Sequence, residues 1–256
     1  MSGDLARRSA VGLGLVAIAA TALVAGGILF WLLAVVAALF MMAEWSDLHA
    51  AEPRAKRIGQ FGLSIPLAIM APVAAGPTFF SLGLVAGAGF FIAAVTRRGA
   101  LGWGAAYVGL PVLALLLLRS QEGGLVLAFW AMALVWATDI GAYFAGRSIG
   151  GPKLAPAISP NKTWAGLGGG VLAAGAFGAA LHLWGGLPFV LAAATPLLAV
   201  LAQAGDLYES WLKRRAGVKD SGNVLPGHGG VLDRLDGLVP VAPIAALLVE
   251  IPRWVG

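Results

Sequence analysis

The stretch LVLAFWAMALVWATD, residues 125–139, decides the fold class. It is an unbroken apolar run that ends in a threonine and an aspartate, and a membrane-spanning helix needs about 20 such residues. Further runs rich in alanine, leucine and glycine lie on both sides of it along the chain. Continuous runs indicate helices, whereas the strands of an outer-membrane barrel would alternate apolar and polar residues. The sequence therefore predicts an all-α, polytopic integral membrane protein.

The composition of the whole chain leads to the same fold class. Of the 256 residues, 59% are apolar and 11% are charged, and the mean hydropathy is +0.88. Soluble domains are about 45–50% apolar and about 25% charged, so a water-soluble globular protein and a disordered chain are both excluded. The absence of cysteine excludes a disulfide-stabilised secreted domain and thiol redox chemistry.

About nine apolar segments are long enough to be placed in a bilayer, and glycine-containing turns separate several of them. We expect transmembrane helices at roughly 9–25, 27–43, 59–75, 78–95, 100–118, 124–145, 165–184, 187–209 and 238–255. The first pair is too long for a cleavable signal peptide, and one kinked element over 9–43 is the alternative. We expect a single integral membrane domain over residues 1–256, with an N-terminal helical region (1–123) and a catalytic half (124–256).

The basic residues indicate the orientation of these helices. If the N-terminus is cytoplasmic and the spans alternate, only Arg119 and Arg253 of the 17 lysines and arginines lie outside. Basic residues concentrate in cytoplasmic loops, so this distribution predicts a multi-pass protein of the cell inner (plasma) membrane. The predicted cytoplasmic loops are 44–58, 96–99, 146–164 and 210–237. The net charge of +5 then reflects topology, and we expect no nucleic-acid partner.

Two of the predicted cytoplasmic segments, residues 138–166 and 205–237, combine carboxylates with lysines, arginines and glycines. Six of the twelve acidic residues lie there: Asp139, Asp206, Glu209, Asp220, Asp233 and Asp236. Carboxylate oxygens bind Mg²⁺, and Lys and Arg bind phosphate oxygens. Asp139 and Asp206 each end an apolar run, where an ionisable group is a functional candidate. The structural alternative is an interfacial carboxylate that faces headgroup water. The pattern predicts a cytoplasmic-face active site for metal-bound phosphates.

The segment SWLKRRAGVKDSGNVLPGHGGVLDRLD, residues 210–236, resembles the signature of the phosphatidate cytidylyltransferases, also called CDP-diacylglycerol synthases. The matching positions are Ser210, Lys213, Arg214, Lys219, Asp220, Gly222, Leu225, Pro226, His228, Gly229, Gly230, Asp233, Arg234 and Asp236. Three upstream blocks also resemble the family: Asp139 with AYFAGR, SPNKTWAG at 159–166 and GDLYES at 205–210. One position departs from the pattern, because members often carry glutamate where this chain has Ala165.

This resemblance implies that CTP and phosphatidic acid react at a lipid bilayer to give CDP-diacylglycerol and pyrophosphate. It implies a catalytic group of Lys219, Asp220, His228, Asp233 and Asp236. It implies substrate binding by Ser159, Asn161, Lys162, Thr163, Lys213, Arg214, Gly229, Gly230 and Arg234. It implies a Mg²⁺ site drawn from Asp139, Asp206, Asp220, Asp233 and Asp236. The surplus of carboxylates leaves room for a second, monovalent ion, and a homodimer is left open.

The predicted chemistry needs no general base. A phosphate monoester loses its second proton near pH 6 to 7, so about neutral pH the lipid phosphate is already a nucleophile. We therefore expect His228 to donate a hydrogen bond to a phosphate or to orient the glycine loop. The alternative enzyme is a CTP-dependent polyprenol or lipid kinase, whose hydroxyl acceptor does need a base. An ion-coupled transporter is the alternative from another class, but neither charged block is repeated in the first half of the chain.

Overall fold

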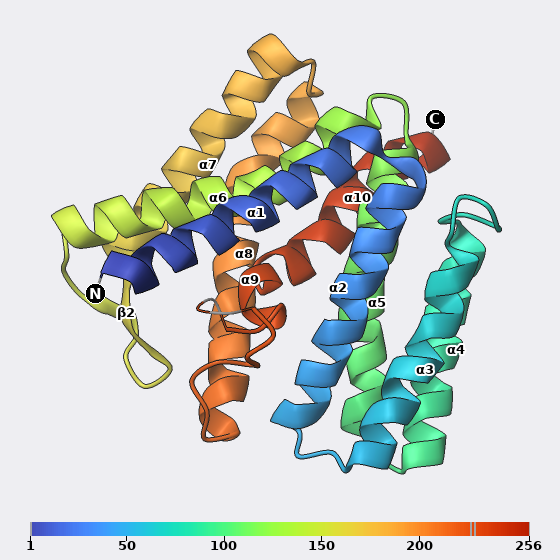
Figure 1. Ribbon diagram of the computed structural model, residues 1–256. Helices are drawn as coiled ribbons and strands as arrows, with labels where there is room; N and C mark the ends of the chain where they lie inside the picture. Colours follow the sequence, from blue (N-terminus) through green and yellow to red (C-terminus); the bar gives the residue numbers. More distant parts are fainter. Residues whose placement is uncertain (1, 226, 228, 256) are drawn as a thin grey trace.

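The computed structural model describes residues 2–225, 227 and 229–255, with side chains for residues 11–225, 227 and 229–251. The described chain is almost entirely helical, as Figure 1 shows. Its long helices are α1 (Ser2–Ala25), α2 (Gly27–Leu48), α3 (Pro53–Ile69), α4 (Phe79–Thr96), α5 (Gly99–Ser120), α6 (Gly124–Ser148), α7 (Trp164–Gly185), α8 (Phe189–Arg215) and α10 (Leu238–Val255). A hairpin of β1 (Lys153–Ala155) and β2 (Ser159–Thr163) precedes α7, and the short helix α9 (Leu232–Leu235) precedes α10. The all-α prediction is confirmed.

Six of the described helices are long and apolar enough to cross a membrane. These are α2, α4, α5, α6, α7 and α8. Helix α3 has 17 residues and carries charges in its first turns. The apolar parts of α1 and α10, Val11–Ala25 and Leu238–Ile251, are also shorter than a full span. The structure thus confirms a helical membrane protein, and it supports six of the predicted spans by length and composition.

The first two apolar segments form two helices rather than one kinked element. Helix α1 ends at Ala25, and Gly26 adopts a left-handed φ of 63° before α2 begins. The side chain of Arg119 lies against this turn, where its Nε donates to the carbonyl of Leu23 (2.8 Å) and its Nη2 to that of Val24 (3.0 Å). A Cβ atom on Gly26 would lie 2.5 Å from that Nη2 atom. Only glycine fits both the backbone conformation and the close approach.

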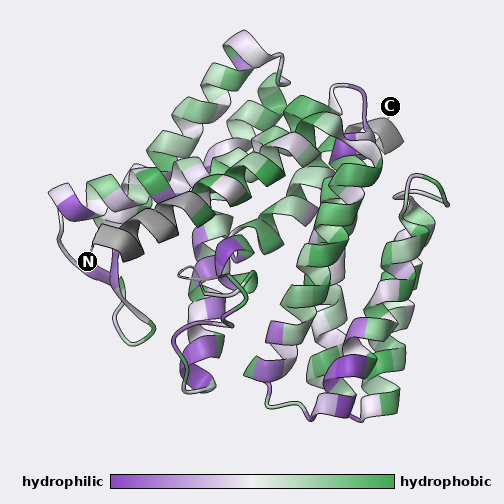
Figure 2. Ribbon diagram, viewed as in Figure 1, coloured by the Kyte–Doolittle hydropathy of each residue, from purple (hydrophilic) through white to green (hydrophobic). Residues whose placement is uncertain are grey.

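The charged loops gather at one end of the bundle. Figure 2 shows hydrophilic residues at the lower ends of α2, α3 and α8 and in the connections beside them. The Arg98 Nη1 atom donates to the carbonyl of Ala50 (3.0 Å), which joins the α2–α3 and α4–α5 connections. The Arg214 Nε atom donates to the carbonyl of Ile158 (3.4 Å), which joins the end of α8 to the hairpin. Candidate polar chemistry is therefore concentrated on one side of the apolar body.

Small residues allow α6 and α7 to pack closely, and this packing positions the site. A Cβ atom on Gly169 of α7 would collide with the side chain of Ala145 on α6. A Cβ atom on Gly141 of α6 would lie 2.6 Å from the carbonyl oxygen of Gly169. The Trp130 Nε1 atom donates to Thr195 Oγ1 (2.9 Å), so α8 is held against α6 as well. Close helix contacts through small residues are typical of membrane interiors.

Candidate active site

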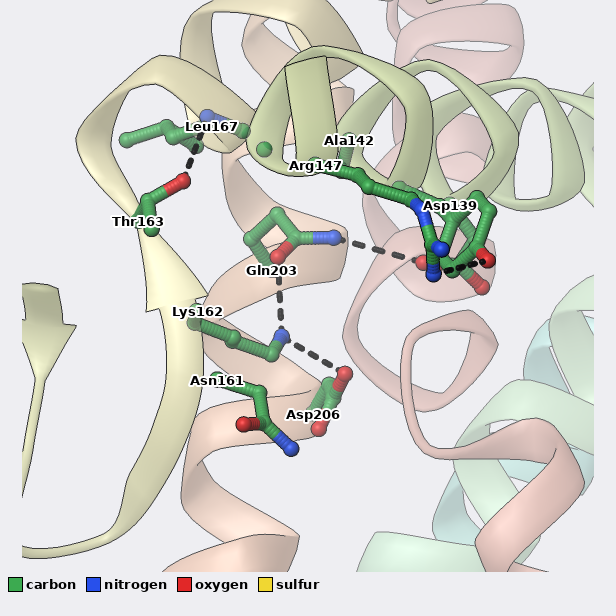
Figure 3. Close-up of a pocket in the computed structure, with 12 residues that line it drawn as sticks. Asp139, Ala142, Arg147, Asn161, Lys162, Thr163, Leu167, Gln203 and Asp206 are labelled. Atoms are coloured by element: carbon green, nitrogen blue, oxygen red, sulfur yellow. Dashed lines mark hydrogen bonds and ion pairs between the residues drawn. The ribbon is translucent and has the colours of Figure 1, made fainter. Parts of the chain in front are cut away.

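A cavity of about 540 Å³ lies where α6, β2, α7 and α8 meet, and Figure 3 shows the side chains that line it. Its polar lining comes from both segments that the sequence marks as candidates. The lining residues are Asp139, Ala142, Tyr143, Gly146, Arg147, Asn161, Lys162, Thr163, Gly166, Leu167, Gln203 and Asp206. Residues 138–166 and the start of 205–237 thus meet at this cavity.

The hairpin delivers Lys162 to the cavity. Strand β2 pairs antiparallel with β1, with Lys153 opposite Thr163 and Ala155 opposite Ser159. Thr163 then caps α7, because its Oγ1 atom accepts a hydrogen bond from the backbone N–H of Gly166 (3.0 Å). A threonine in this position satisfies one of the unpaired N–H groups of the first helical turn. The cap fixes the point at which the strand becomes a helix, one residue after Lys162.

A chain of polar contacts crosses the cavity, as the dashed lines in Figure 3 mark. The Nζ atom of Lys162 lies 2.6 Å from Asp206 Oδ2 and donates to Gln203 Oε1 at 2.8 Å. Gln203 in turn donates from Nε2 to Asp139 Oδ1 at 3.3 Å. Gln203 is buried, with 5% of its surface exposed. Sequence reasoning missed Gln203, although a glutamine within the apolar run of α8 was a signal that could have found it.

Arg147 adds a second cation to the cavity. It lies in the last turn of α6, and its Nη1 atom donates to the hydroxyl of Tyr143 at 3.3 Å. A guanidinium group presents several donors in one plane, which suits phosphate oxygens. The cavity therefore offers cations from Lys162 and Arg147 beside carboxylates from Asp139 and Asp206.

Asp233 is held by Lys213 of α8 and by the connection between α8 and α9 (residues 216–231), which we call the signature loop. The Nζ atom of Lys213 donates to Oδ1 (2.6 Å), and Oδ2 accepts from Gly230 N (2.8 Å), Ser221 N (2.9 Å) and Ser221 Oγ (3.0 Å). Burial alone would raise the pKa of Asp233, but these hydrogen bonds outweigh it and hold the pKa below its ordinary value. Lys213 also pairs with the buried Glu209 (3.3 Å). Asp233 thus anchors the loop.

Asp236 connects this loop with the cavity. Burial raises the pKa of Asp236 to about 7, and the negative charges of Asp206 and Asp139 act in the same direction. The N–H of Gly237 (2.7 Å from Oδ1) and the charge of Lys213 oppose the shift. Three carboxylates that repel one another in this way favour a cation nearby.

The donor set fits a magnesium ion that binds together with phosphate. Among the residues that the structure describes, no three acidic or histidine side chains form a complete metal site. Magnesium commonly takes one or two protein carboxylates and fills its remaining positions with water and substrate phosphates. Asp139 and Asp206 line the cavity, and Asp236 lies against Gly205, the residue before Asp206, so carboxylates of this kind are available there.

The other predicted site residues lie around this centre. Ser159 begins β2, and Asn161 and Thr163 line the cavity. Lys219 and Asp220 are exposed in the segment after α8, and Arg234 on α9 is within electrostatic reach of Asp139. Gly229 has a left-handed φ of 81° and accepts from the N–H of Leu225 at 3.0 Å. His228 and Pro226 lie outside the described residues.

Two further residues of the loop's surroundings escaped the sequence analysis. Ser221 is buried and donates a hydrogen bond from its backbone N–H to Asp233. Glu44 on α2 accepts hydrogen bonds from the same loop. The signal for Glu44 was present, because it is an ionisable residue at the end of an apolar run.

Comparisons with known proteins agree with the signature at 210–236. The sequence model described as "Cytidylyltransferase family" matches residues 6–252. The phosphatidate cytidylyltransferase of Brucella suis biovar 1 (strain 1330) is 44% identical over 234 residues, which cover 87% of this chain and 84% of that protein. The phosphatidate cytidylyltransferase of Bacillus subtilis (strain 168) is 46% identical over 134 residues, or 51% of this chain and 50% of that protein. The chain therefore belongs to the cytidylyltransferase family.

Proposed function

We propose that this protein transfers the cytidylyl group of CTP to phosphatidic acid, giving CDP-diacylglycerol and pyrophosphate for phospholipid biosynthesis. Relatives that match most of this chain bear the name phosphatidate cytidylyltransferase. One observation carries the proposal at the level of the site. Lys162 pairs with Asp206 in the cavity, and Asp236, the last residue of the signature, lies against α8 beside Asp206, because a Cβ atom on Gly205 would lie 2.5 Å from the carbonyl oxygen of Asp236. Cations and carboxylates are thereby assembled around one space, as a reaction between two polyanions requires.

The reaction needs two phosphates to approach each other. An oxygen of the lipid phosphate attacks the α-phosphorus of CTP, and the bond from that phosphorus to the bridging oxygen breaks, releasing pyrophosphate. Lys162 and Arg147 would hold phosphate oxygens and reduce the repulsion between the substrates. Asp206 and Asp236 would hold Mg²⁺, which when bound neutralises charge on the triphosphate. The lipid phosphate is largely dianionic near neutral pH, so no side chain has to remove its proton.

The surroundings of the cavity suit a lipid substrate. Next to Asp139, helix α6 exposes large apolar side chains: Ile140 (59%), Tyr143 (59%) and Phe144 (63%). In a bilayer Ile140 and Phe144 would contact acyl chains, while Asp139, Tyr143 and Arg147 on the same helix line the cavity. The headgroup of phosphatidic acid can thus enter the site from the membrane while its chains remain in lipid.

We further propose nine membrane passes with a cytoplasmic N-terminus, in the inner (plasma) membrane. The distribution of the 17 basic residues supports this topology, because it leaves only Arg119 and Arg253 outside. The gathering of the charged loops at one end of the bundle supports it as well. CTP would then reach the site from the cytoplasm.

Radiolabelled CTP tests the proposed reaction against its alternatives. Purified protein in phosphatidic acid vesicles with Mg²⁺ should transfer label to lipid from α-labelled CTP and release pyrophosphate. Transfer from γ-labelled CTP would identify a kinase, and transfer from neither label would leave the transporter alternative.

A further inference from the structure

Glu44 is a buried carboxylate in the N-terminal half of the chain, outside both charged segments of the sequence. It lies in the last part of α2, and 3% of its surface is exposed. A carboxylate withdrawn from water destabilises the fold unless hydrogen bonds replace its solvation. Its partners therefore indicate what the position is for.

The described hydrogen bonds to Glu44 come from the signature loop and from the first residue of α9. The Oε1 atom accepts from the backbone N–H of Val231 (2.9 Å), and Oε2 accepts from that of Leu232 (2.7 Å). The hydroxyl of Ser221 lies 3.0 Å from Oε2 and shares its one proton between this oxygen and Asp233 Oδ2. These partners lie 177 to 188 residues away along the chain. One side chain of α2 thus holds both ends of the loop that precedes α9.

Two glycines of the loop allow this close approach. A Cβ atom on Gly222 would lie 2.8 Å from Glu44 Oε1, and one on Gly230 would lie 2.6 Å from Oε2. Both separations are shorter than real Cβ contacts, so a larger residue would push the loop away from the carboxylate. The loop backbone is therefore shaped around Glu44.

The contact continues from Glu44 into the site. The Ser221 hydroxyl lies 3.0 Å from Glu44 Oε2 and 3.0 Å from Asp233 Oδ2. Asp233 is bound in turn by Lys213 of α8, and Asp236 follows three residues later. Ser221 thus connects Glu44 with Asp233, the acidic residue of α9, which Lys213 of α8 binds.

We propose that Glu44 is a positioning residue of the active site, which fixes the signature loop and thereby the place of Asp233 and Asp236 beside α8. This inference rests on the proposed function. Among the described residues, the hydrogen-bond partners of Glu44 are not ones that line the cavity, so it acts through the loop. Helix α2 packs against α3 and α5 independently of the loop. Loss of the carboxylate should therefore disturb the site more than the helical bundle.

The test compares Glu44→Gln and Glu44→Asp with Asp47→Asn as the matched control. Asp47 is three residues further along α2 and pairs with Lys56, away from the loop. A glutamine keeps the size of the side chain, but its NH₂ group cannot accept the hydrogen bonds from the loop. Because misplacement of about 1 Å can reduce a rate by about 100-fold, we expect Glu44→Gln to lower kcat by about 10- to 100-fold. The Mg²⁺ concentration for half-maximal activity should rise, and Asp47→Asn should stay within about twofold of the parent.

A spin label reports on the loop separately from catalysis. The chain has no cysteine, so Asn223→Cys, an exposed loop position, gives a single labelling site in the full-length protein. We expect the label to become more mobile with Glu44→Gln and to remain restrained with Asp47→Asn. Glu44→Asp keeps the charge and should recover part of both kcat and restraint. If Glu44→Gln does not fold, Glu44→Asp takes its place in each of these comparisons.

Two results would overturn the inference. One is a Glu44→Gln variant, or Glu44→Asp where Glu44→Gln does not fold, that retains kcat and Mg²⁺ dependence within twofold of the parent. The other is loss of activity while the label at residue 223 stays as restrained as before. If the unmutated protein fails to transfer α-label from CTP to lipid, the proposed function fails instead, and label mobility still decides whether Glu44 holds the loop.

Discussion

The Nζ atom of Lys162 lies 2.6 Å from Oδ2 of Asp206, so the strand before α7 is tied to the helix that leads into the signature loop. The two groups neutralise each other in this arrangement. A phosphate that binds Lys162 would compete for its charge and leave Asp206 free to bind a metal ion. Nucleotide and metal binding should therefore be coupled through this pair.

Replacing Lys162 should weaken the use of CTP. We expect Lys162→Ala to lower kcat/KM for CTP by about 100-fold, because a cation on the phosphates is lost in a partly buried site. Steady-state transfer of α-label measures this. Lys153→Ala, an exposed lysine of the same hairpin, is the control and should stay within about twofold. Equal effects of both substitutions would contradict a specific role for Lys162.

Asp236 and Asp233 should respond differently to substitution. We expect Asp236→Asn to reduce turnover by at least about 100-fold with little change in thermal unfolding, because it would remove a metal ligand. Asp233→Asn should lose similar activity and also lower the unfolding temperature, since Asp233 accepts from Lys213, Ser221 and Gly230. Parallel kinetics and thermal unfolding distinguish the two. Near-normal turnover of Asp236→Asn would refute its metal role.

Single-cysteine labelling checks the proposed topology. Ser221 is only 6% exposed, so the exposed Asn223 is the better labelling site in the same loop. An impermeant thiol reagent should leave Asn223→Cys unlabelled in intact cells and label it after permeabilisation. Glu122→Cys, in the exposed turn between α5 and α6, should react from outside. The reverse pattern would invert the proposed orientation.

The pH profile tests the absence of a general base. Phosphate ionisation near pH 6 to 7 should set the acidic limb, as expected for a phosphate monoester with a second pKa of about 6. His228→Gln should then lower the rate and leave that limb in place. Disappearance of the limb, together with rescue by imidazole, would assign the base to His228 and favour the kinase alternative.

The sequence predicted the long helices and the segments that line the cavity better than it predicted the hydrogen bonds that individual side chains form. Apolar runs located the long helices, and the charged segments located Asp139, Lys162 and Asp206 at one cavity. The hairpin of β1 and β2 was not expected, because its short strands lie within a polar connection. The engagement of Asp233 by Ser221 and Gly230 could not be predicted either, since it depends on where loop backbone N–H groups point.

The pairing of Glu44 with residues 221–232 also constrains the order in which the protein is made. Glu44 leaves the ribosome 188 residues before Leu232, which at about 5 to 20 residues per second corresponds to a delay of roughly 10 to 40 s. For that period α2 holds a carboxylate without its loop partners. Assembly of the site consequently waits until residue 232 has been made, and a nascent chain that stops before residue 221 leaves Glu44 without the hydrogen bonds of the mature fold.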